Sequence, residues 1–418
     1  FHQSKSNPST SNIVMASKKG AADAIESTGA RFGRVKNNLK MGLVGLPNVG
    51  KSSLFNLLTQ QAVSAENFPF CTIDPNEARC PVPDQRYEWL CKVWKPASEY
   101  PAYLHCTDIA GLIRGASEGA GLGNAFLSHI QAVDGIFHII RAFKSDEVVH
   151  VDDSVDPVRD LDTIQSELCK KDIAYVLQQR DAREKDVKKN PNMKLPPMFF
   201  TVMDKVQELL ENNRAISSAE WTTPEVEKIN ELLPQLITSK PVIYLINLSK
   251  RDFIRKGNKW LAPIKEWIDS HGGGVAIPFS IEFEQELWEL RDNQDAKRAF
   301  LDECQGAKSV LPRVIKVGYR QLNLMYYFTA GEKEVRCWTV RKGATAPQAA
   351  GVIHSDFEKG FIKAEVVTFD DFKTIAGEDK KGMAKVKAAG KFRQEGKTYI
   401  VQDGDIVHFQ FNVSKSKK

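Results

Sequence analysis

The chain has 418 residues, enough for two or three domains that each bury a hydrophobic core. Its 42% hydrophobic and 27% charged residues are typical of a globular protein. No apolar run approaches the ~18 to 20 residues that a membrane-spanning helix needs. The net charge of +5, part of which lies in the C-terminal tail, is compatible with nucleic-acid contact but does not indicate it.

The first 36 residues are predicted to form a tail. Residues 1–14, FHQSKSNPSTSNIV, are polar and aperiodic, and Met15 would be a natural first residue of the protein. We therefore expect the first fourteen residues to be non-native. The seven cysteines lack Cys-x-x-Cys spacing, which indicates reduced thiols. Because the N-terminus also lacks the apolar core of a signal peptide, we predict a cytoplasmic protein.

The first folded element is a buried strand at residues 41–44, followed directly by a phosphate-binding loop. Residues 45–52 read GLPNVGKS, the G-x-x-x-x-G-K-S pattern, and helically spaced leucines follow. The two glycines let successive backbone N–H groups point at the phosphates. Lys51 supplies a cation to the β- and γ-phosphate oxygens, and the Ser52 hydroxyl binds Mg²⁺. The predicted nucleotide contacts here are Asn48, Val49, Gly50, Lys51, Ser52 and Ser53.

Two further elements of a nucleotide switch follow along the chain. Thr72, in NFPFCTIDPNEA, lies at a suitable distance to close over Mg²⁺ when the γ-phosphate is present. An apolar strand then ends at the sequence DIAG, in which Asp108 would hold Mg²⁺ through water and the Gly111 N–H would meet the γ-phosphate. The predicted metal ligands are therefore Ser52, Thr72 and Asp108.

These residues resemble a known family. GLPNVGKSSLFN, NFPFCTIDPNEA, DIAGLIRGASEGAGLGNAFLSHI and NLSKRDF are together similar to the Obg-like ATPase (YchF) subfamily of Obg-related, translation-factor-class P-loop GTPases, over about residues 40–412. The resemblance implies a P-loop α/β fold and ATP in preference to GTP. It also implies that Leu248 lies at the base.

The base-reading motif departs from the GTPase pattern Asn-Lys-x-Asp, whose carboxylate accepts from guanine N1–H and N2–H₂. In one register Asn247 directly follows the predicted strand 242–246, and Lys250 then stands at the position of the carboxylate. In the other register, Asp252 supplies the carboxylate. We favour the first, because open α/β sheets bind ligands at the C-terminal ends of their strands. Lysine cannot accept these bonds, so the preference for guanine should be lost. Adenine would meet backbone carbonyls or Asn247, and Ser280 would lie in the last base-contacting loop.

The group that activates the attacking water is unknown from the sequence. Leu112 follows D-x-x-G, where Ras-like enzymes carry a water-orienting glutamine, so basal hydrolysis should be slow. Asn48 either supports a catalytic K⁺ or only caps its loop. His129 more readily suits a structural role than a catalytic one. Arg114 in cis and an activating protein in trans are further candidates.

After a strand at 135–143, residues 156–190 have apolar residues at helical spacing, and helical patterns return after the break NPNMKLPP. This predicts an antiparallel, coiled-coil-like helical arm inserted into the nucleotide domain. Its charged residues suit a solvated face, and an RNA-binding groove between arm and core is the alternative.

From residue 314 onward, short β-rich runs and one helix near 347–354 predict a small β-grasp domain. The sequence is similar to a TGS domain, the ubiquitin-like module of threonyl-tRNA synthetases and some GTPases, and this resemblance implies RNA or ribosome-associated partners. Four aromatic residues either fill its core, which we favour, or stack on bases: Tyr326, Tyr327, Phe328 and Trp338.

The predicted fold class is therefore α/β. A P-loop domain with a mostly parallel sheet occupies 37–151 and 240–310, a helical insertion 152–239, a TGS domain 314–412 and a basic tail 413–418. We expect a monomeric Mg²⁺-dependent nucleoside triphosphatase, with K⁺ as a further cofactor. It would hydrolyse ATP, with GTP as an alternative substrate, as a switch linked to ribosomes, RNA or regulatory proteins. The rival interpretations are a guanine-specific GTPase using Asp252 and a ribosome- or RNA-binding scaffold with a structural nucleotide.

Overall fold

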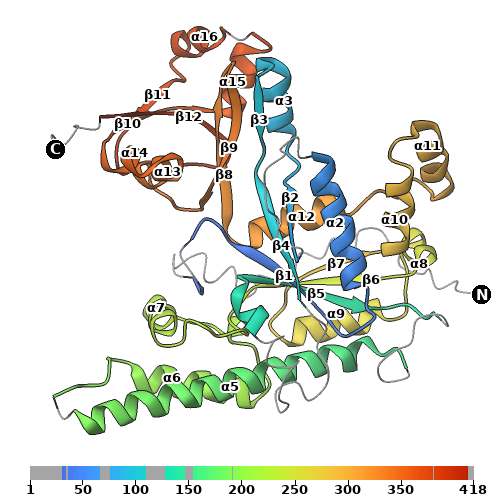
Figure 1. Cartoon of the computed structure of the whole chain (residues 1–418), viewed down its shortest axis with the longest axis vertical. Coiled ribbons are helices and arrows are strands. Elements are labelled where there is room, and N and C mark those ends of the chain that lie inside the picture. The colour runs from blue at the N-terminus through green and yellow to red at the C-terminus, as the bar shows by residue number, and fades with distance from the viewer. Residues whose placement is uncertain are drawn as a thin grey trace, which may run out of the picture.

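The computed structural model describes residues 31–33, 36–65, 76–109, 128–145, 154–190, 192–379 and 381–412. Two six-stranded sheets organise the molecule. The first sheet lies in the middle, a long pair of helices lies at one end, and the second sheet lies at the other (Figure 1). The predicted α/β class is confirmed.

The first sheet has the order β2-β4-β1-β5-β6-β7, and every neighbouring pair is parallel except β2 with β4. Every residue of β5 is buried, as expected for a strand of a parallel sheet covered on both faces. Its strands are β1 Lys40–Val44, β2 Glu77–Pro81, β4 Tyr103–Asp108, β5 Gly135–Arg141, β6 Val242–Asn247 and β7 Val275–Phe279.

Helices pack on this sheet. On one face, α9 (Leu261–Ser270) contacts Ile140, Tyr244 and Ile246. Elsewhere α12 (Leu311–Gln321) packs on β4 and β5, closely enough that a side chain at Gly318 would meet Phe137. The remaining helices of this part are α2 Lys51–Ala65, α8 Lys250–Arg255, α10 Ile281–Glu289 and α11 Gln294–Glu303.

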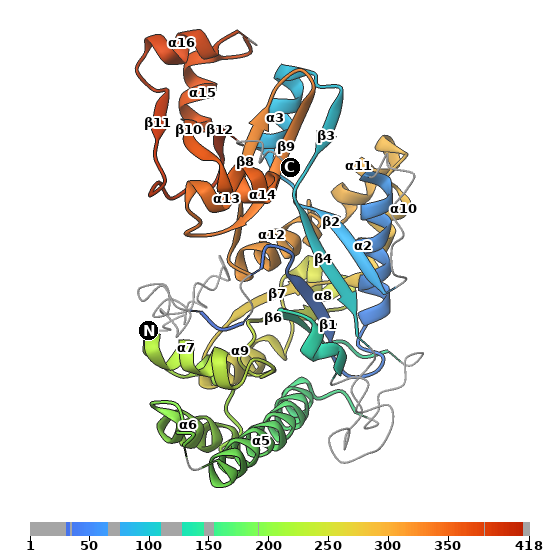
Figure 2. The same cartoon turned by 60° about the vertical axis from the view of Figure 1, so that its left-hand side comes forward.

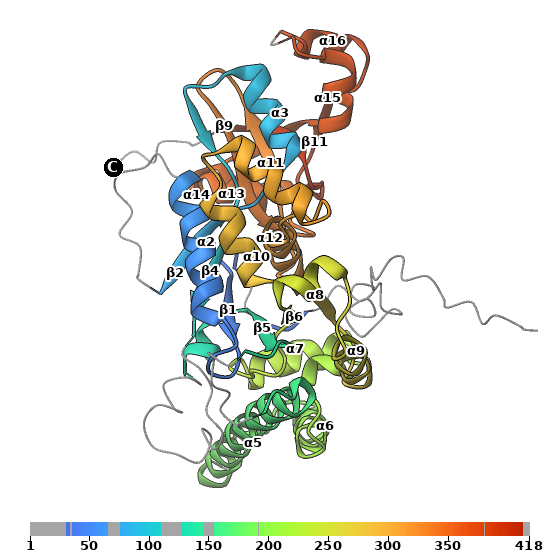
Figure 3. The ribbon, with the colours of Figure 1, turned by 90° about the vertical axis from the view of Figure 1, so that its right-hand side faces the viewer.

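The chain between β5 and β6 forms the helical insertion. The helix α5 (Pro157–Lys189) runs for 33 residues from an Asp156 cap, and α6 (Phe199–Glu211) packs beside it, as Figure 3 shows. The turn η1 (Ile216–Ser218) and α7 (Thr223–Leu232) follow, the latter capped by Thr222 and Glu225. Apolar residues of α5, α6 and α7 form a separate core, so the insertion has an interior of its own.

The C-terminal sheet has the order β11-β10-β12-β8-β9-β3. Within residues 324–412, the last strand, β12, is parallel to the first strand, β8, and lies beside it, as in a β-grasp fold. The elements are β8 Leu324–Ala330, β9 Glu334–Arg341, α13 Ala346–Ile353, α14 Ser355–Lys359, β10 Phe361–Thr368, α15 Phe369–Ala376, α16 Met383–Ala388, β11 Arg393–Glu395 and β12 Asp405–Phe411. Tyr326, Tyr327 and Phe328 are buried, so these three fill the interior and are not available to stack on bases.

One element crosses the predicted domain boundary. The strand β3 (Ser98–Tyr100), from the N-terminal part of the chain, pairs in parallel with β9 and forms one edge of the C-terminal sheet (Figure 2). The preceding helix α3 (Gln85–Trp94) packs on β8 and β9. The segment between β2 and β4 is therefore built into the C-terminal domain.

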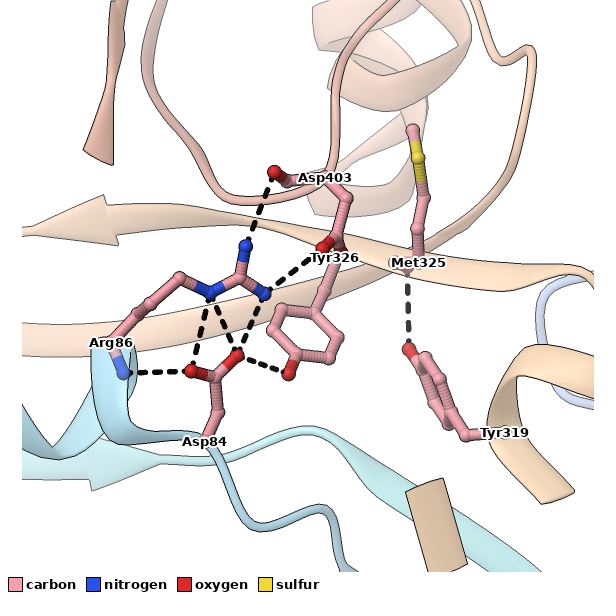
Figure 4. A network of polar contacts seen from close by, with 6 residues as sticks. All are labelled: Asp84, Arg86, Tyr319, Met325, Tyr326 and Asp403. Carbon is pink, nitrogen blue, oxygen red and sulfur yellow. Dashed lines mark hydrogen bonds and ion pairs between the residues drawn. The ribbon is translucent and has the colours of Figure 1, made fainter. Parts of the chain in front are cut away.

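A polar network joins the two parts at this point (Figure 4). Asp84 caps α3 and accepts hydrogen bonds from Arg86 and from the Tyr326 hydroxyl. Arg86 also pairs with Asp403, at 3.0 Å between Nη2 and Oδ2. Burial opposes the shift, but the hydrogen bonds from Arg86 and Tyr326 keep the pKa of Asp84 below its ordinary value. The network is thus a charged junction between α3 and the C-terminal sheet.

Candidate nucleotide-binding site

The phosphate loop between β1 and α2 has a shape that only glycine allows at two positions. A Cβ atom at Gly45 would lie 2.6 Å from the backbone oxygen of Ile139. Gly50 has a φ of +103°, and a Cβ there would lie 2.2 Å from Ile281 Cδ1. Asn48 also adopts a left-handed conformation, with a φ of 61°. The loop therefore curls around its own backbone N–H groups as the motif requires.

A cavity of about 600 Å³ opens beside this loop. It lies at the C-terminal ends of β1, β5, β6 and β7, where open α/β sheets bind ligands. Seven predicted residues line it: Asn48, Gly50, Lys51, Ser52, Ser53, Asn247 and Leu248. Val49 and Ser280 are buried and do not line it; the Ser280 hydroxyl accepts from Phe283 N–H and caps α10.

Lys51 is a buried cation at the floor of the cavity. Its ammonium group donates to the backbone oxygen of Leu46 at 2.7 Å, which directs the side chain over the loop. Burial lowers the pKa of Lys51 to about 8, and the nearby charge of Asp108 opposes that shift. A negatively charged phosphate would compensate for the lost hydration of this ammonium group.

Ser52 and Asp108 form an oxygen pair suited to Mg²⁺. Ser52 Oγ lies 3.4 Å from Asp108 Oδ2, while Asp108 Oδ1 is buried and has no hydrogen-bond partner within the described residues. Burial raises the pKa of Asp108, against the effects of the Lys51 charge and of hydrogen bonds from Ser52 and the Ile109 N–H. A buried carboxylate oxygen without a donor fits a hard divalent cation, which would supply positive charge beside the phosphates.

The other predicted phosphate and catalytic groups are only partly visible. Thr72, Gly111, Leu112 and Arg114 lie outside the residues that the structure describes. His129 is exposed in a short helical segment at 128–132 and does not line the cavity. The described part of the chain therefore offers no role in the chemistry for His129, and Asn48 is the one catalytic candidate that reaches the site.

Asn247 connects two parts of the site. Its side-chain amide donates to Val49 O at 3.0 Å, and its side-chain oxygen accepts from Ile281 N–H at 3.2 Å. The residue is buried, so both bonds are shielded from water. The structure uses both polar atoms of Asn247 to tie the phosphate loop to α10, a role that the sequence did not indicate.

Neither residue considered for base reading faces the cavity. Lys250 turns away from it, pairs with Glu286, and places its ammonium group 4.7 Å from the centre of the Phe300 ring. Asp252 accepts a hydrogen bond from Asn258 Nδ2 at 2.6 Å and also lies outside the lining. Neither register places its charged side chain in the lining of the cavity.

Other residues line the cavity that sequence reasoning did not select. They follow β5 and β7, the strands on either side of β6: Phe143, Lys144, Ser145, Ile281, Glu282 and Gln285. Their position was the one available signal, because Ile281 and Glu282 come directly after Ser280, which the sequence predicts in the last base-contacting loop. Glu282 is a carboxylate that lies outside the base-reading motif in the sequence but lines the cavity in the fold.

The chain is similar to known proteins over nearly its whole length. The model for the C-terminal domain of YchF GTPases, described as a protein of unknown function (DUF933), matches residues 324–412, and that for a 50S ribosome-binding GTPase matches 40–179. The rice (Oryza sativa subsp. japonica) protein named Obg-like ATPase 1 is 53% identical over 403 residues, 96% of this chain and 99% of that protein. Its human counterpart is 51% identical over 390 residues, 93% and 96% of the two chains.

A solved structure agrees with these matches. The structure of the Schizosaccharomyces pombe YchF GTPase is 44% identical and superposes with a TM-score of 0.79, covering 91% of this chain and 100% of that one. Among the described residues, no helix is both long and apolar enough to cross a bilayer. With the phosphate loop, the cavity and the C-terminal sheet in place, the chain belongs to the Obg-like ATPase (YchF) family of P-loop nucleoside triphosphatases.

Proposed function

We propose that this chain hydrolyses ATP to ADP and phosphate with Mg²⁺, and that GTP is an alternative substrate. The observation that carries the proposal is that Lys51 and Ser52 line one cavity and that Asp108 lies next to Ser52, with its Oδ2 3.4 Å from the serine hydroxyl. These groups supply phosphate binding and metal coordination, which are the main protein contributions to phosphoryl transfer. The name of the relatives, Obg-like ATPase 1, supports ATP as the substrate.

Purified protein can test this directly. Phosphate release from ATP should require Mg²⁺, and Lys51→Ala should reduce the rate at saturating ATP by at least about tenfold, since a charge-assisted contact to the transferred group is lost. Asn212→Ala, on an exposed residue of the helical insertion, is the matched control and should leave the rate unchanged. ATP hydrolysis that is equal in the wild type and the Lys51→Ala variant would refute the proposal.

We further propose that K⁺ stimulates hydrolysis. Asn48 lines the cavity from the phosphate loop, and a bound cation there could stabilise charge that develops on the transferred phosphoryl group. The rate should rise when Na⁺ is replaced by K⁺ at constant ionic strength, and Asn48→Ala should remove that difference. Equal rates in the two salts would eliminate the potassium mechanism while leaving ATP hydrolysis intact.

We propose that the chain acts as a nucleotide-dependent switch with ribosomes, RNA or a regulatory protein in the cytoplasm. We propose further that it is monomeric and has the domain boundaries predicted from its sequence. Support comes from the description of the matching GTPase model as ribosome-binding and from the six described cysteines, all buried free thiols. Single-turnover hydrolysis should accelerate when ribosomes are added, and ribosome binding should differ between ATP and ADP. Binding that is indifferent to nucleotide would instead indicate a scaffold.

A further inference from the structure

The cavity contains a carboxylate that belongs to neither arrangement of the base-reading motif. Glu282 is the second residue of α10 and lines the cavity with Leu248 and Ser249. Its Oε2 accepts from Lys250 N–H at 3.2 Å. The other oxygen, Oε1, has no hydrogen-bond partner in the part of the chain that the structure describes, so it can accept from a ligand.

The position of this carboxylate is informative. In the favoured register, Lys250 stands where GTPases carry the aspartate that reads guanine. A carboxylate on that residue would lie about 3 to 4 Å from its own backbone nitrogen. Glu282 Oε2 is 3.2 Å from the same nitrogen, although it arrives from α10 and not from α8. Glu282 therefore places a negative charge in the cavity lining, next to the backbone of the motif position that lacks one.

The lysine that replaced the aspartate does not interfere with this arrangement. Its ammonium group is directed to Glu286, one turn further along α10, and to the face of Phe300. The hydrogen bond to Glu286 raises the pKa of Lys250, so the pair stays ionised. Glu286 does not line the cavity, which leaves Glu282 as the acidic side chain next to Leu248 among the described lining residues.

We propose that Glu282 reads the Watson–Crick edge of guanine from α10, and that this chain therefore retains GTP as a true second substrate. The inference rests on the proposed binding of nucleotide in this cavity. Guanine presents two donors, N1–H and N2–H₂, to which one carboxylate can be the acceptor. Adenine presents an acceptor, N1, at the same edge. Because Glu282 is exposed, its side chain can turn into water when adenine is bound, so ATP is tolerated.

Equilibrium titration with non-hydrolysable analogues of ATP, GTP and ITP tests the inference in the full chain. Glu282→Gln should weaken GTP binding by about tenfold, the loss expected for one hydrogen bond to a charged group, and change ATP binding less than about twofold. ITP lacks the N2 amino group, so the wild type should bind GTP more tightly than ITP. That difference should largely disappear in Glu282→Gln.

Glu289→Gln is the matched control, because it makes the same chemical change at an exposed position of the same helix outside the cavity and should preserve the ratio of GTP to ATP affinity. An unchanged ratio in Glu282→Gln would overturn the inference. So would a selective loss of ATP binding, which would mean that the carboxylate meets the adenine amino group, or a loss of GTP binding in Asp252→Asn with none in Glu282→Gln. A wild type that binds none of the three nucleotides would instead refute the proposed function.

Discussion

Asn247 links the base side of the site to the phosphate side. Because its amide is already bonded to Val49 and Ile281, we expect it to position the loop and not to choose the base. Asn247→Ala leaves two buried polar groups without partners and should cost about 1 to 3 kcal/mol of folding free energy. ATP and GTP affinities should fall by similar factors when measured by titration.

Asn247→Ala should lower the ATP and GTP affinities together, whereas Glu282→Gln should lower mainly the GTP affinity. A loss confined to ATP in Asn247→Ala would show that the side chain contacts adenine, as the sequence suggested. Asn212→Ala is again a suitable control, because that exposed amide only caps the end of α6, bonding to Glu208 O at 2.8 Å. It should change neither nucleotide affinity nor stability by more than about 0.5 kcal/mol.

A side chain at Gly50 should disrupt the phosphate loop. The left-handed φ of +103° disfavours any side chain, and an added Cβ would collide with Ile281 Cδ1 at 2.2 Å and approach Asn247 Nδ2 to 2.9 Å. Gly50→Ala should therefore lower the melting temperature and abolish measurable phosphate release. Gly273→Ala is the control for backbone strain alone, since Gly273 has a φ of +78° with nothing within 4 Å. Its melting temperature should fall while ATP hydrolysis continues.

The residues of the phosphate loop were predictable because their chemistry is local. Gly50, Lys51 and Ser52 are consecutive, and one motif fixes their roles. Glu282 was not predictable in this way, since it meets Lys250 only when α10 and α8 come together in the fold. The direction of the Lys250 side chain likewise depends on Glu286, which is 36 residues away. Identity at a motif position therefore did not determine which group enters the cavity.

Among the elements, α5 carries a buried carboxylate, Asp172, that bonds to the segment before β6. Asp172 accepts from the backbone N–H groups of Ile237 and Thr238 and from the Thr238 hydroxyl, at 2.7 to 3.1 Å. These residues precede β6, so the bonds tie the insertion to the strand that leads into the nucleotide site. Burial raises the pKa of Asp172 to about 6, although the same hydrogen bonds oppose the shift.

This pKa predicts how stability changes with pH. The unfolded carboxyl titrates near its ordinary pKa of about 4, so between pH 4 and 6 the folded protein binds the extra proton. Stability from this group is therefore present at low pH and is lost as pH rises through 6. The free energy of unfolding of the wild type minus that of Asp172→Asn, which cannot titrate, should fall by about 1 to 3 kcal/mol between pH 4 and pH 7.

Chemical denaturation at several pH values measures that difference. Asp181→Asn, at an exposed position of the same helix, should show no such trend. If the difference between wild type and Asp172→Asn grows as pH rises, the hydrogen bonds dominate burial and Asp172 remains ionised in the fold.

Long elements with strong periodicity were predicted correctly from the sequence. The helix α5 follows from the spacing of its apolar residues, and the strand β6 ends at Asn247 as expected. The strand β3 was not predicted, because three residues carry too little pattern and its partner, β9, lies more than 200 residues further along the chain. Short edge strands gain their stability from the partner and not from their own sequence.

At the scale of the whole molecule, the C-terminal sheet depends on the N-terminal part of the chain. The C-terminal domain contributes Tyr326 and Phe328 from β8, and Phe369 and Phe372 from α15, to the same core as the first sheet. From α3, Trp89 packs edge-on against Phe369 at 5.5 Å between ring centres. Residues 324–412, although they match a family model of their own, lack this covering segment.

We therefore expect residues 324–412, expressed alone, to expose these apolar residues and the edge of β9 and to aggregate. Size-exclusion chromatography and near-ultraviolet circular dichroism would show the outcome. The full chain is the reference, and a monomeric fragment with cooperative thermal unfolding would contradict the prediction. The aromatic residues at strand spacing correctly indicated a β-grasp core, but no local pattern indicated that a distant helix completes it.

The path of the chain around β3 has a mechanical consequence. After Tyr100 the backbone passes through Pro101 and Ala102 into β4, which ends at Asp108 beside Ser52. Because only two residues connect β3 to β4, a displacement of β4 along its own axis would also displace β3 at the edge of the C-terminal sheet. Displacement by one residue corresponds to about 3.3 Å. The C-terminal sheet is thus joined through two residues to the strand that carries Asp108, so a displacement of that strand would be transmitted to the far sheet.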